Sequence, residues 1–427
     1  MSDPIHRTRP DFFTVRPAAP GRITRVTDFI HLSEGLSNAY LLVTGAGRIV
    51  VNTGMGFEGP VHRENFDAVD RGPIRYVVFT QGHVDHVGGT DHFREAGTEV
   101  VAQVGNVAHQ ADDARIGPFR ARRSAFAFAD AIAEANRAMR KSAPGAPSGQ
   151  ARPEPTMTFR DRLKLELGGL QLELLATPGG ETTDSLVVWL PQHGICLTGN
   201  LLSALYGHFP NLVTIRGDRY RDPLRFVESL ERVLALGAET LLPGHHGPVE
   251  GAGRVRESLE RIRDAVLFVH DETVKAMNAG RSVHEVMQEL RLPPELEVGE
   301  GYGKVAWSVR AIWENYAGWF HARSTTELYA VPESSVHRDL VELAGGADAV
   351  AARALVRLAR GDAVEALHLA EVALGAVPEH SGALAASLAA HRVLLERCLA
   401  TPGPNFWEVA WLRREVGSLE ASVKAGP

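Results

Sequence analysis

Residues 80–89 carry the side chains of this chain that are best suited to chemistry. They read Thr-Gln-Gly-His-Val-Asp-His-Val-Gly-Gly and directly follow the apolar run 76–79. Imidazole and carboxylate groups, here those of His83, Asp85 and His86, are ligands that Zn²⁺ takes in proteins. A loop that leaves a strand can point neighbouring side chains inward, and the two final glycines let the backbone turn tightly behind them. The segment therefore predicts a metal site; the alternative is a polar loop whose histidines occur by chance.

Other motifs stand in order around this segment, and together they resemble those of the metallo-β-lactamase superfamily. The signature of that family reads T-H-x-H-x-D-H-x-G-G, and this chain departs from it at Gln81, where the family has histidine. It also departs at Asn52, which stands where the opening hairpin of the family usually has aspartate. The remaining matches are the hairpin sequence at 37–55, Thr-Pro-Gly-Gly-Glu at 177–181, Thr-Gly-Asn at 198–200 and Pro-Gly-His at 243–245.

One branch of that family is matched more closely than the others. A glutamate at position 181, one place after the usual histidine of the T-P-G-H motif, is typical of the alkylsulfatase-like branch. Residues 210–223 are similar to the N-L-x-T-x-R-G-x-x-x-R-D segment of that branch, and 309–313 with 316–320 resemble the start of its helical dimerisation domain. The resemblance runs over most of residues 25–415, and several motifs in order are more specific than any one of them.

The resemblance implies an α/β fold, with an αββα metallo-β-lactamase sandwich followed by an all-α, tetratricopeptide-like dimerisation domain. The residue patterns agree, because β-rich runs interleave with helical stretches in the first part and only helical stretches follow from Gly253. At 427 residues the chain is also longer than one ordinary core requires. We therefore expect a polar arm at 1–20, a catalytic domain at 21–252 with an insertion at 105–155, a helical domain at 253–415 and a tail at 416–427.

Apolar periodicity predicts some elements in more detail. Alternating residues on both sides of Gly168-Gly169 predict a β-hairpin over 162–176. The insertion contains a helix-prone stretch, 124–141, followed by a segment rich in Pro, Gly and Ser, 142–155. Such a long excursion is either a mobile lid over the active site or a plain surface loop.

The helical half predicts self-association. Helices expected at 347–360 and 363–377 form one tetratricopeptide-type hairpin, which cannot bury its own face and must pack on a neighbour or on another subunit. An aromatic stripe at helical spacing occurs nearby; its members are Trp307, Ile312, Trp313, Tyr316 and Phe320. By resemblance we expect a homodimer built through residues 255–400.

The composition excludes several classes of protein. A net charge of −7 and 44% hydrophobic residues describe a globular protein without the basic surplus of a nucleic-acid binder. Only two cysteines occur, which excludes a thiolate-rich metal site. The first residues are polar where a signal peptide needs an apolar core, and no run approaches the roughly 20 apolar residues of a membrane span. We expect a cytoplasmic protein with a small-molecule partner, no nucleic acid and no membrane.

The resemblance implies a centre with two metal positions. Asp85, His86 and His245 are expected to hold one Zn²⁺ and to leave a place for water, the usual open arrangement of a catalytic zinc. His245 is preferred over His246 because it follows Gly244, as the family motif requires.

The second metal position is degenerate in this chain. His83 and Glu181 are expected there, with Gln81 as a weak carbonyl ligand. Asn200 replaces a bridging carboxylate, and so removes a negative charge that normally holds two dications together. One tight ion is therefore predicted, and a second that is weaker or absent.

Hydrogen-bond donors for an anion are concentrated shortly after the metal motifs. They are Asn211, Thr214, Arg216 and Arg221. Planar guanidinium groups suit a tetrahedral oxyanion such as sulfate, because one group can engage two oxygens at once. The alternative is that the two arginines are ordinary salt-bridge partners of Asp218 and Asp222, since exposed ion pairs are common and weak.

Two residues are candidates for a direct catalytic role. Asp85 is expected at the metal, where a bound water becomes a nucleophile near neutral pH. His208 is either an acid for the leaving group or a plain loop residue.

Three functions remain open on these grounds. The first is a zinc-dependent hydrolase of alkylsulfatase type that cleaves a small anionic ester, with sulfate esters favoured. The second is a metallo-hydrolase of carboxylic esters, lactones or another small substrate, because Gln81 and Asn200 alter the centre and this fold hosts many reactions. The third is a non-catalytic metal-binding scaffold that acts through its helical half.

Overall fold

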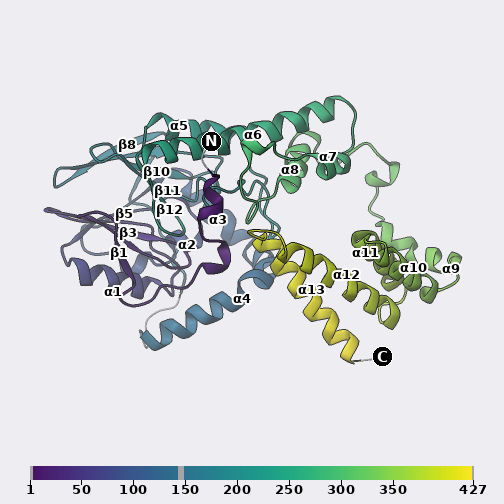
Figure 1. Ribbon diagram of the computed structural model, residues 1–427. Helices are drawn as coiled ribbons and strands as arrows, with labels where there is room; N and C mark the ends of the chain where they lie inside the picture. Colours follow the sequence, from purple (N-terminus) through teal and green to yellow (C-terminus); the bar gives the residue numbers. More distant parts are fainter. Residues whose placement is uncertain (1–2, 143–148, 426–427) are drawn as a thin grey trace. The chain divides into compact units, whose positions relative to one another are not determined.

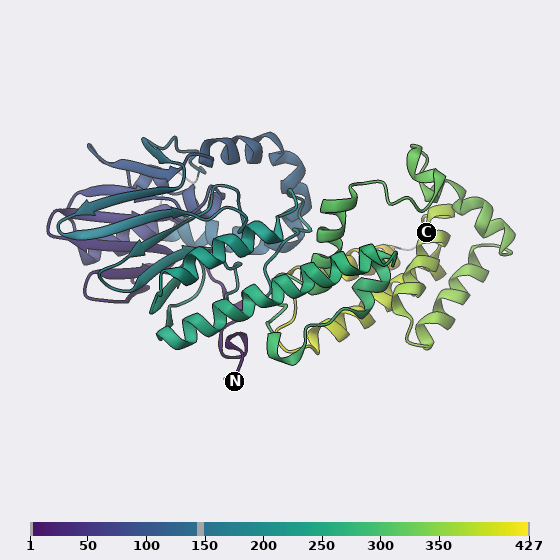
Figure 2. The same cartoon turned by 90° about the horizontal axis from the view of Figure 1, so that it is seen from above.

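The computed structural model describes residues 3–142 and 149–425. Contacts between residues divide the chain into two compact units. The first ends at Tyr316, and the second starts at Ala317. Both β-sheets lie in the first unit, and the described part of the second unit is helical (Figures 1 and 2). The predicted fold class, a two-sheet sandwich followed by an all-helical region, is confirmed.

The first sheet has the strand order β1-β2-β3-β4-β5-β6-β7. Its strands are antiparallel from β1 to β4 and parallel from β4 to β7. They span Ile23–Arg25, Ile30–Ser33, Ala39–Thr44, Gly47–Val51, Ile74–Val78, Glu99–Gln103 and Met157–Phe159.

The second sheet has the order β13-β12-β11-β10-β9-β8. Its strands, from β8 to β13, span Arg162–Leu167, Leu170–Ala176, Leu186–Leu190, Ile195–Gly199, Thr240–Pro243 and Val249–Glu250. The hairpin predicted around Gly168-Gly169 is β8–β9, and both glycines have positive φ angles, +58° and +86°, which a tight turn requires.

Apolar side chains fill the space between the sheets and cover their outer faces. Val51 of the first sheet and Val188 of the second belong to one cluster of buried residues between the sheets. Phe66 of α1 (Gly59–Val69) covers the outer face of the first sheet. Phe226 of α5 (Pro223–Ala235) and Val266 of α6 (Ala252–Asn278) cover the second sheet, which completes the αββα layers.

The predicted insertion is largely helical. It forms α3 (Asn106–Arg115) and α4 (Gly117–Ser142), which extend the expected helix of 124–141 toward the N-terminus. Ala135 of α4 packs on Phe57, which lies just before α1, so this helix packs within the first unit. Part of the Pro-rich stretch, 143–148, lies outside the described residues.

Three helices that the sequence assigns to the helical domain pack on the sandwich. They are α6, α7 (Val283–Glu289) and α8 (Val305–Ala317). Buried residues of all three belong to the same cluster as β10 and α5, so the first compact unit extends to the end of α8.

The second unit is built from α9 (His337–Leu343), α10 (Ala347–Ala359), α11 (Ala363–Ala376), α12 (Ser381–Leu399) and α13 (Phe406–Ala425). The predicted hairpin is α10–α11; its small contact residues are buried, and it packs on α9 and α12 of the same unit. Helix α13 runs through the segment predicted as a tail. Among the described residues, no helix combines the length and the apolar character that crossing a bilayer demands.

Short 3₁₀ turns complete the described chain. They are η1 (Ile5–Thr8), η2 (Phe12–Thr14), η3 (Thr90–His92), η4 (Pro294–Leu296), η5 (Thr325–Leu328) and η6 (Glu333–Val336).

Candidate metal centre and anion loop

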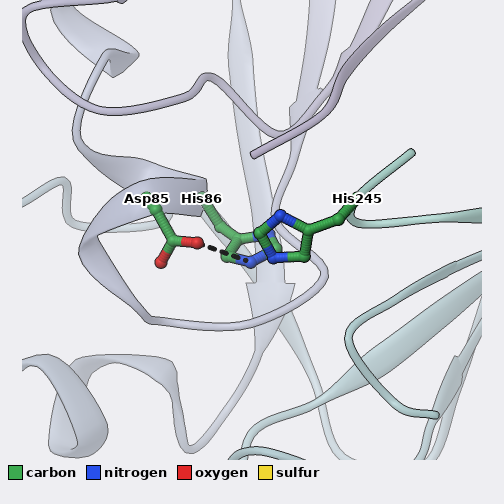
Figure 3. Close-up of side chains that lie close together, drawn as sticks. All are labelled: Asp85, His86 and His245. Carbon is green, nitrogen blue, oxygen red and sulfur yellow. Dashed lines mark ion pairs between the residues drawn. The ribbon is translucent and has the colours of Figure 1, made fainter. Parts of the chain in front are cut away.

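Asp85, His86 and His245 form one group in the structure (Figure 3). Asp85 and His86 lie on α2 (Val84–Val87), a single turn that begins shortly after β5, and His245 lies in the loop after β12. One ligand atom of each residue lies within 4.8 Å of the others, and Asp85 Oδ2 is 3.4 Å from His86 Nε2. Loops from both sheets therefore bring three metal-type ligands to one point.

The protonation of this group suits a cation. Burial lowers the pKa of both His86 and His245, that of His86 to about 4, so both imidazoles are neutral near pH 7. Burial raises the pKa of Asp85, but the neighbouring imidazoles lower it by more. His86 Nε2 and His245 Nδ1 are buried, with no hydrogen-bond partner among the described residues. A carboxylate beside two neutral imidazoles with unpartnered nitrogens fits a divalent ion such as Zn²⁺.

The orientation of His86 is set by residues behind it. Its Nδ1 lies 3.4 Å from Thr80 Oγ1. The Thr80 hydroxyl donates to Asn52 Oδ1 at 3.1 Å, and the Thr80 N–H donates to the same oxygen at 2.9 Å. Because Thr80 contacts Nδ1, the ring presents Nε2 toward Asp85, as a metal ligand needs.

The predicted residues of the second metal position also lie together. His83 Nδ1 is 3.6 Å from Glu181 Oε2 and 2.9 Å from Gln81 Nε2. All three side chains are buried, and Gln81 Oε1 has no partner among the described residues. This position therefore holds one imidazole and one carboxylate, with an amide where the family has a third strong ligand.

Asn200 lies between the two positions. Its Nδ2 donates to Glu181 Oε2 over 3.1 Å and lies 3.2 Å from His245 Nε2. Since a carboxylate only accepts, the amide must turn its N–H group toward Glu181, and an N–H group cannot bind a cation. Asn200 Oδ1 faces Gly244. A Cβ atom on residue 244 would lie only 2.0 Å from this oxygen, so residue 244 has no room for a side chain. Asn200 therefore joins the two positions through hydrogen bonds.

The structure separates His245 from its neighbour His246. His246 has a φ of +60°, and its Nε2 lies 3.1 Å from Thr14 Oγ1. Asn38 Nδ2 donates to Pro243 O at 2.9 Å and to His246 O at 2.7 Å, which fixes this loop so that only His245 joins Asp85.

The anion loop, residues 211–221, lies beside Glu181. Arg221 Nη1 is 3.6 Å from Glu181 Oε1 and also donates to Asn211 O. Burial lowers the pKa of Arg216, but Tyr302 and the carboxylates, Glu181 and Asp85 among them, raise it by more. Several buried polar atoms of this loop have no partner among the described residues: Asn211 Nδ2, Thr214 Oγ1, Arg216 Nε and Arg221 Nη2. The four residues predicted to bind an anion thus present unsatisfied polar groups next to the metal positions.

Salt bridges with the two nearby aspartates do not account for these arginines. Asp218 Oδ2 lies 3.0 Å from Arg120 Nη2. Asp222 accepts from the N–H groups of two residues of α5, and so caps that helix. Within the described part of the chain, Arg216 forms no ion pair, and Arg221 pairs with Glu181 instead of an aspartate.

His208 occupies a different place from the other predicted site residues. It is buried, its Nδ1 accepts from Gly301 N–H at 2.9 Å, and its ring centroid is 5.6 Å from that of His6. Burial lowers its pKa to about 3. It does not line the cavity beside Glu181, and its catalytic role remains a prediction from the sequence.

A cavity of about 1490 Å³ opens beside Glu181. Residues of α3, α4, the anion loop and α8 line it, with Thr214 and Arg221 at its wall. It lies within the first compact unit, and it offers room for a small substrate next to the metal positions.

Two residues near the site were missed in the sequence. Tyr302 is buried, and burial together with Glu181 raises the pKa of its phenol. The ring centroid of Phe12, on η2, lies 5.8 Å from that of His245 and 5.0 Å from that of Tyr302. The segment predicted as a polar arm therefore packs against the site. Neither residue belongs to a motif; aromatic residues inside a polar arm were the only available signal.

Comparison with known proteins places this architecture in a family. The profile of the metallo-beta-lactamase superfamily matches residues 32–268, more than half of the chain. The chain belongs to the metallo-β-lactamase superfamily. The alkyl sulfatase dimerisation profile matches residues 282–410, which confirms the resemblance seen in the sequence.

Relatives of this superfamily member include named sulfatases. It is 31% identical to a linear primary-alkylsulfatase of Pseudomonas sp. over 74% of this chain and 62% of the relative. It is 25% identical to the alkyl/aryl-sulfatase BDS1 of Saccharomyces cerevisiae over 79% of this chain and 55% of the relative. It therefore spans roughly three fifths of the length of these relatives.

A solved structure with the same fold is the stereoselective inverting sec-alkylsulfatase Pisa1 of Pseudomonas sp.. The superposition has a TM-score of 0.80 at 23% identity and covers 95% of this chain and 66% of that one. At this identity the likeness establishes the fold, so the activity must be argued from the site.

Proposed function

We propose that this chain is a zinc-dependent hydrolase of small anionic esters, with sulfate esters as the favoured substrates. The position of Arg216 carries the proposal. The carboxylates of Glu181 and Asp85 help to raise its pKa, and it has no ion pair among the described residues. A half-buried cation beside the predicted metal ligands, left without an ion pair, suits an anionic group of a substrate.

The anion loop supplies the remaining contacts for that group. Asn211 and Thr214 offer one buried polar atom each, and Arg221 offers the nitrogen that does not face Asn211. Donors on several sides match the tetrahedral arrangement of oxygens in a sulfate ester better than the planar carbonyl of a carboxylic ester. The sulfatase activities of the relatives agree with this choice.

The residues that would hold the tight metal ion are Asp85, His86 and His245. A divalent ion held there would polarise a substrate oxygen and would lower the pKa of a water molecule. Thr80 fixes the ring of His86, and Phe12 covers one side of His245. We propose that a second ion binds more weakly near His83 and Glu181.

A second candidate function is hydrolysis of carboxylic esters or lactones. It is favoured by the amides at Gln81 and Asn200, which alter the second metal position without touching the first. With that position weakened, fewer positive charges remain to balance a dianionic transition state than in a two-metal centre.

Three esters of 4-nitrophenol, together with one alkyl sulfate, separate the candidates. We expect the metal-loaded protein to hydrolyse 4-nitrophenyl sulfate and hexyl sulfate, and the chelator-treated protein to lose this activity. 4-Nitrophenyl phosphate and 4-nitrophenyl acetate serve as the anionic and neutral comparisons. Faster turnover of the acetate than of both sulfates would favour the second candidate; no metal-dependent turnover of any ester would favour a scaffold.

We further propose that the active form is a homodimer. The dimerisation profile covers residues 282–410, and several large apolar side chains of the second unit are exposed, among them Trp319, Tyr329 and Leu343. Exposed apolar surface of this kind is typical of an interface.

A further inference from the structure

Helix α4 of the insertion contacts the anion loop on both sides of Arg216. Arg123 of α4 donates from Nη2 to the carbonyl oxygen of Ile215 at 2.7 Å. Gly217 has a φ of +89°, and a Cβ atom there would lie 3.0 Å from the Phe119 ring and 3.3 Å from Arg123 Nε. The loop thus needs glycine both for its backbone conformation and for the close approach of α4.

A largely buried ion pair adds to this contact. Arg120 Nη2 lies 3.0 Å from Asp218 Oδ2, and their side chains are 12% and 15% exposed. Arg120 also pairs with Asp113 of α3. One guanidinium of α4 therefore binds two carboxylates, one on its own insertion and one on the anion loop.

Asp218 is a potential competitor for Arg216. Burial raises the pKa of Asp218, but His83, Arg120, Arg221 and Arg216 lower it by more, so it is an anion. A carboxylate two residues from Arg216 on a tight loop can pair with that guanidinium as a substrate anion would. In the structure it pairs with Arg120 instead, and Arg216 has no ion pair among the described residues.

We propose that Arg120 is a positioning residue that binds Asp218 and thereby keeps Arg216 available to the anionic group of the substrate. The insertion then acts on specificity through the anion loop, in addition to forming a wall of the cavity. This inference rests on the proposed function, because it assumes that Arg216 contacts the substrate.

A pair of variants tests the competition directly. Arg120→Ala should release Asp218 to Arg216, and so raise KM for 4-nitrophenyl sulfate about ten-fold with kcat changed less than about two-fold. Adding Asp218→Asn in the same chain removes the released carboxylate and should bring KM back to within about three-fold of the unaltered protein. Arg120→Lys should give an intermediate KM. Arg122→Ala is the matched control, because Arg122 is exposed on the same helix and does not line the cavity.

Binding of inorganic sulfate to the metal-loaded full chain, measured by calorimetry, provides a readout without turnover. We expect the affinity for sulfate to be weakest in Arg120→Ala, intermediate in Arg120→Lys and restored in the double variant. Metal content should be unchanged, and the melting temperature of each variant should confirm folding. A double variant as weak as Arg120→Ala would show that Arg120 only braces the loop, and would overturn the proposal. If Arg120→Ala does not fold, Asp218→Asn alone decides: it should leave KM unchanged or lower it, and a ten-fold rise would overturn the proposal.

The failure of this inference differs from the failure of the proposed function. If Arg216→Lys leaves sulfate binding and turnover unchanged, the anion pocket itself is wrong. If Arg216→Lys weakens both and the double variant is not restored, only the role of Arg120 is wrong.

Discussion

The side-chain amide of Asn200 donates to the carboxylate of Glu181 over 3.1 Å. In this way a neutral group satisfies the carboxylate, at the point where the family places a second carboxylate to bridge two ions. The two predicted metal positions therefore differ in the number of strong ligands, three at Asp85, His86 and His245 against two at His83 and Glu181, and this difference can be measured.

We expect one tightly bound divalent ion per chain after dialysis, measured by elemental analysis. Asn200→Asp should raise the content toward two, because it restores an anionic ligand between the positions. Gln81→His should act in the same direction. Two equally tight ions in the unaltered protein would contradict this prediction.

Removal of a strong ligand should abolish metal retention and turnover together. His245→Ala leaves only two strong ligands at the tight position, so the ion should be lost on dialysis. His246→Ala is the matched control: His246 lies next in the chain but contacts Thr14, and metal content should stay normal. If His246→Ala lost the metal and His245→Ala kept it, the ligand would be His246 and not His245.

Arg216→Lys should lower kcat/KM for a sulfate ester at least ten-fold, about 1.4 kcal/mol of transition-state stabilisation. A lysine keeps the charge but cannot engage two oxygens in one plane. Metal content should not change, since Arg216 is not a ligand. Steady-state kinetics of the purified variant check this, and unchanged kinetics would contradict the assignment of Arg216 to an anion pocket.

Glu58 should make the folded state less stable as pH rises, whereas most carboxyl groups make it more stable. Burial raises its pKa to about 7, although the N–H groups of Ala18, Leu36 and Met55 donate to it. The folded state therefore keeps a proton that the unfolded state loses near its ordinary pKa, and stability falls as pH rises from about 4.5 to about 7, by about 1.4 kcal/mol per pH unit at most. Denaturant unfolding of the metal-free protein should show this fall, and Glu58→Gln should show less of it. Parallel curves for the two proteins would disprove the prediction.

The protein should sediment as a homodimer at micromolar concentration. Leu343, 85% exposed on α9, is one of the apolar side chains of the second unit that an interface would cover. Leu343→Asp should weaken the dimer without changing metal content. A monomer of the unaltered protein in sedimentation equilibrium would refute the dimer.

Local sequence patterns predicted the hairpins of this fold, because turn residues and the spacing of nearby apolar residues determine them. The β8–β9 hairpin follows from alternating residues around two glycines, and the α10–α11 hairpin follows from helical spacing around a Gly-Asp turn. Asp85 and His86 could be predicted because they share one turn, and His245 because a short motif marks it.

Contacts between distant segments could not be predicted in this way. Phe12 reaches His245, and Arg120 reaches Asp218, through packing that no periodicity or spacing records. The packing of α6 on the second sheet could not be predicted for the same reason: α6 has the apolar spacing of any buried helix, and the sequence does not say which surface it covers.

The packing of the N-terminal segment has a consequence for biosynthesis. Arg7 pairs with Glu297 at 2.7 Å, and Phe12 contacts both His245 and Tyr302, so the first residues of the chain find their partners almost 300 residues later. Contacts with such sequence separation form late, because the chain entropy between them must be lost first. During translation, the contacts of Phe12 with Tyr302 and of Arg7 with Glu297 can form only after the ribosome has passed Tyr302. A chain released before that point lacks these contacts, and a partly folded chain of this kind exposes apolar surface on which chaperones act.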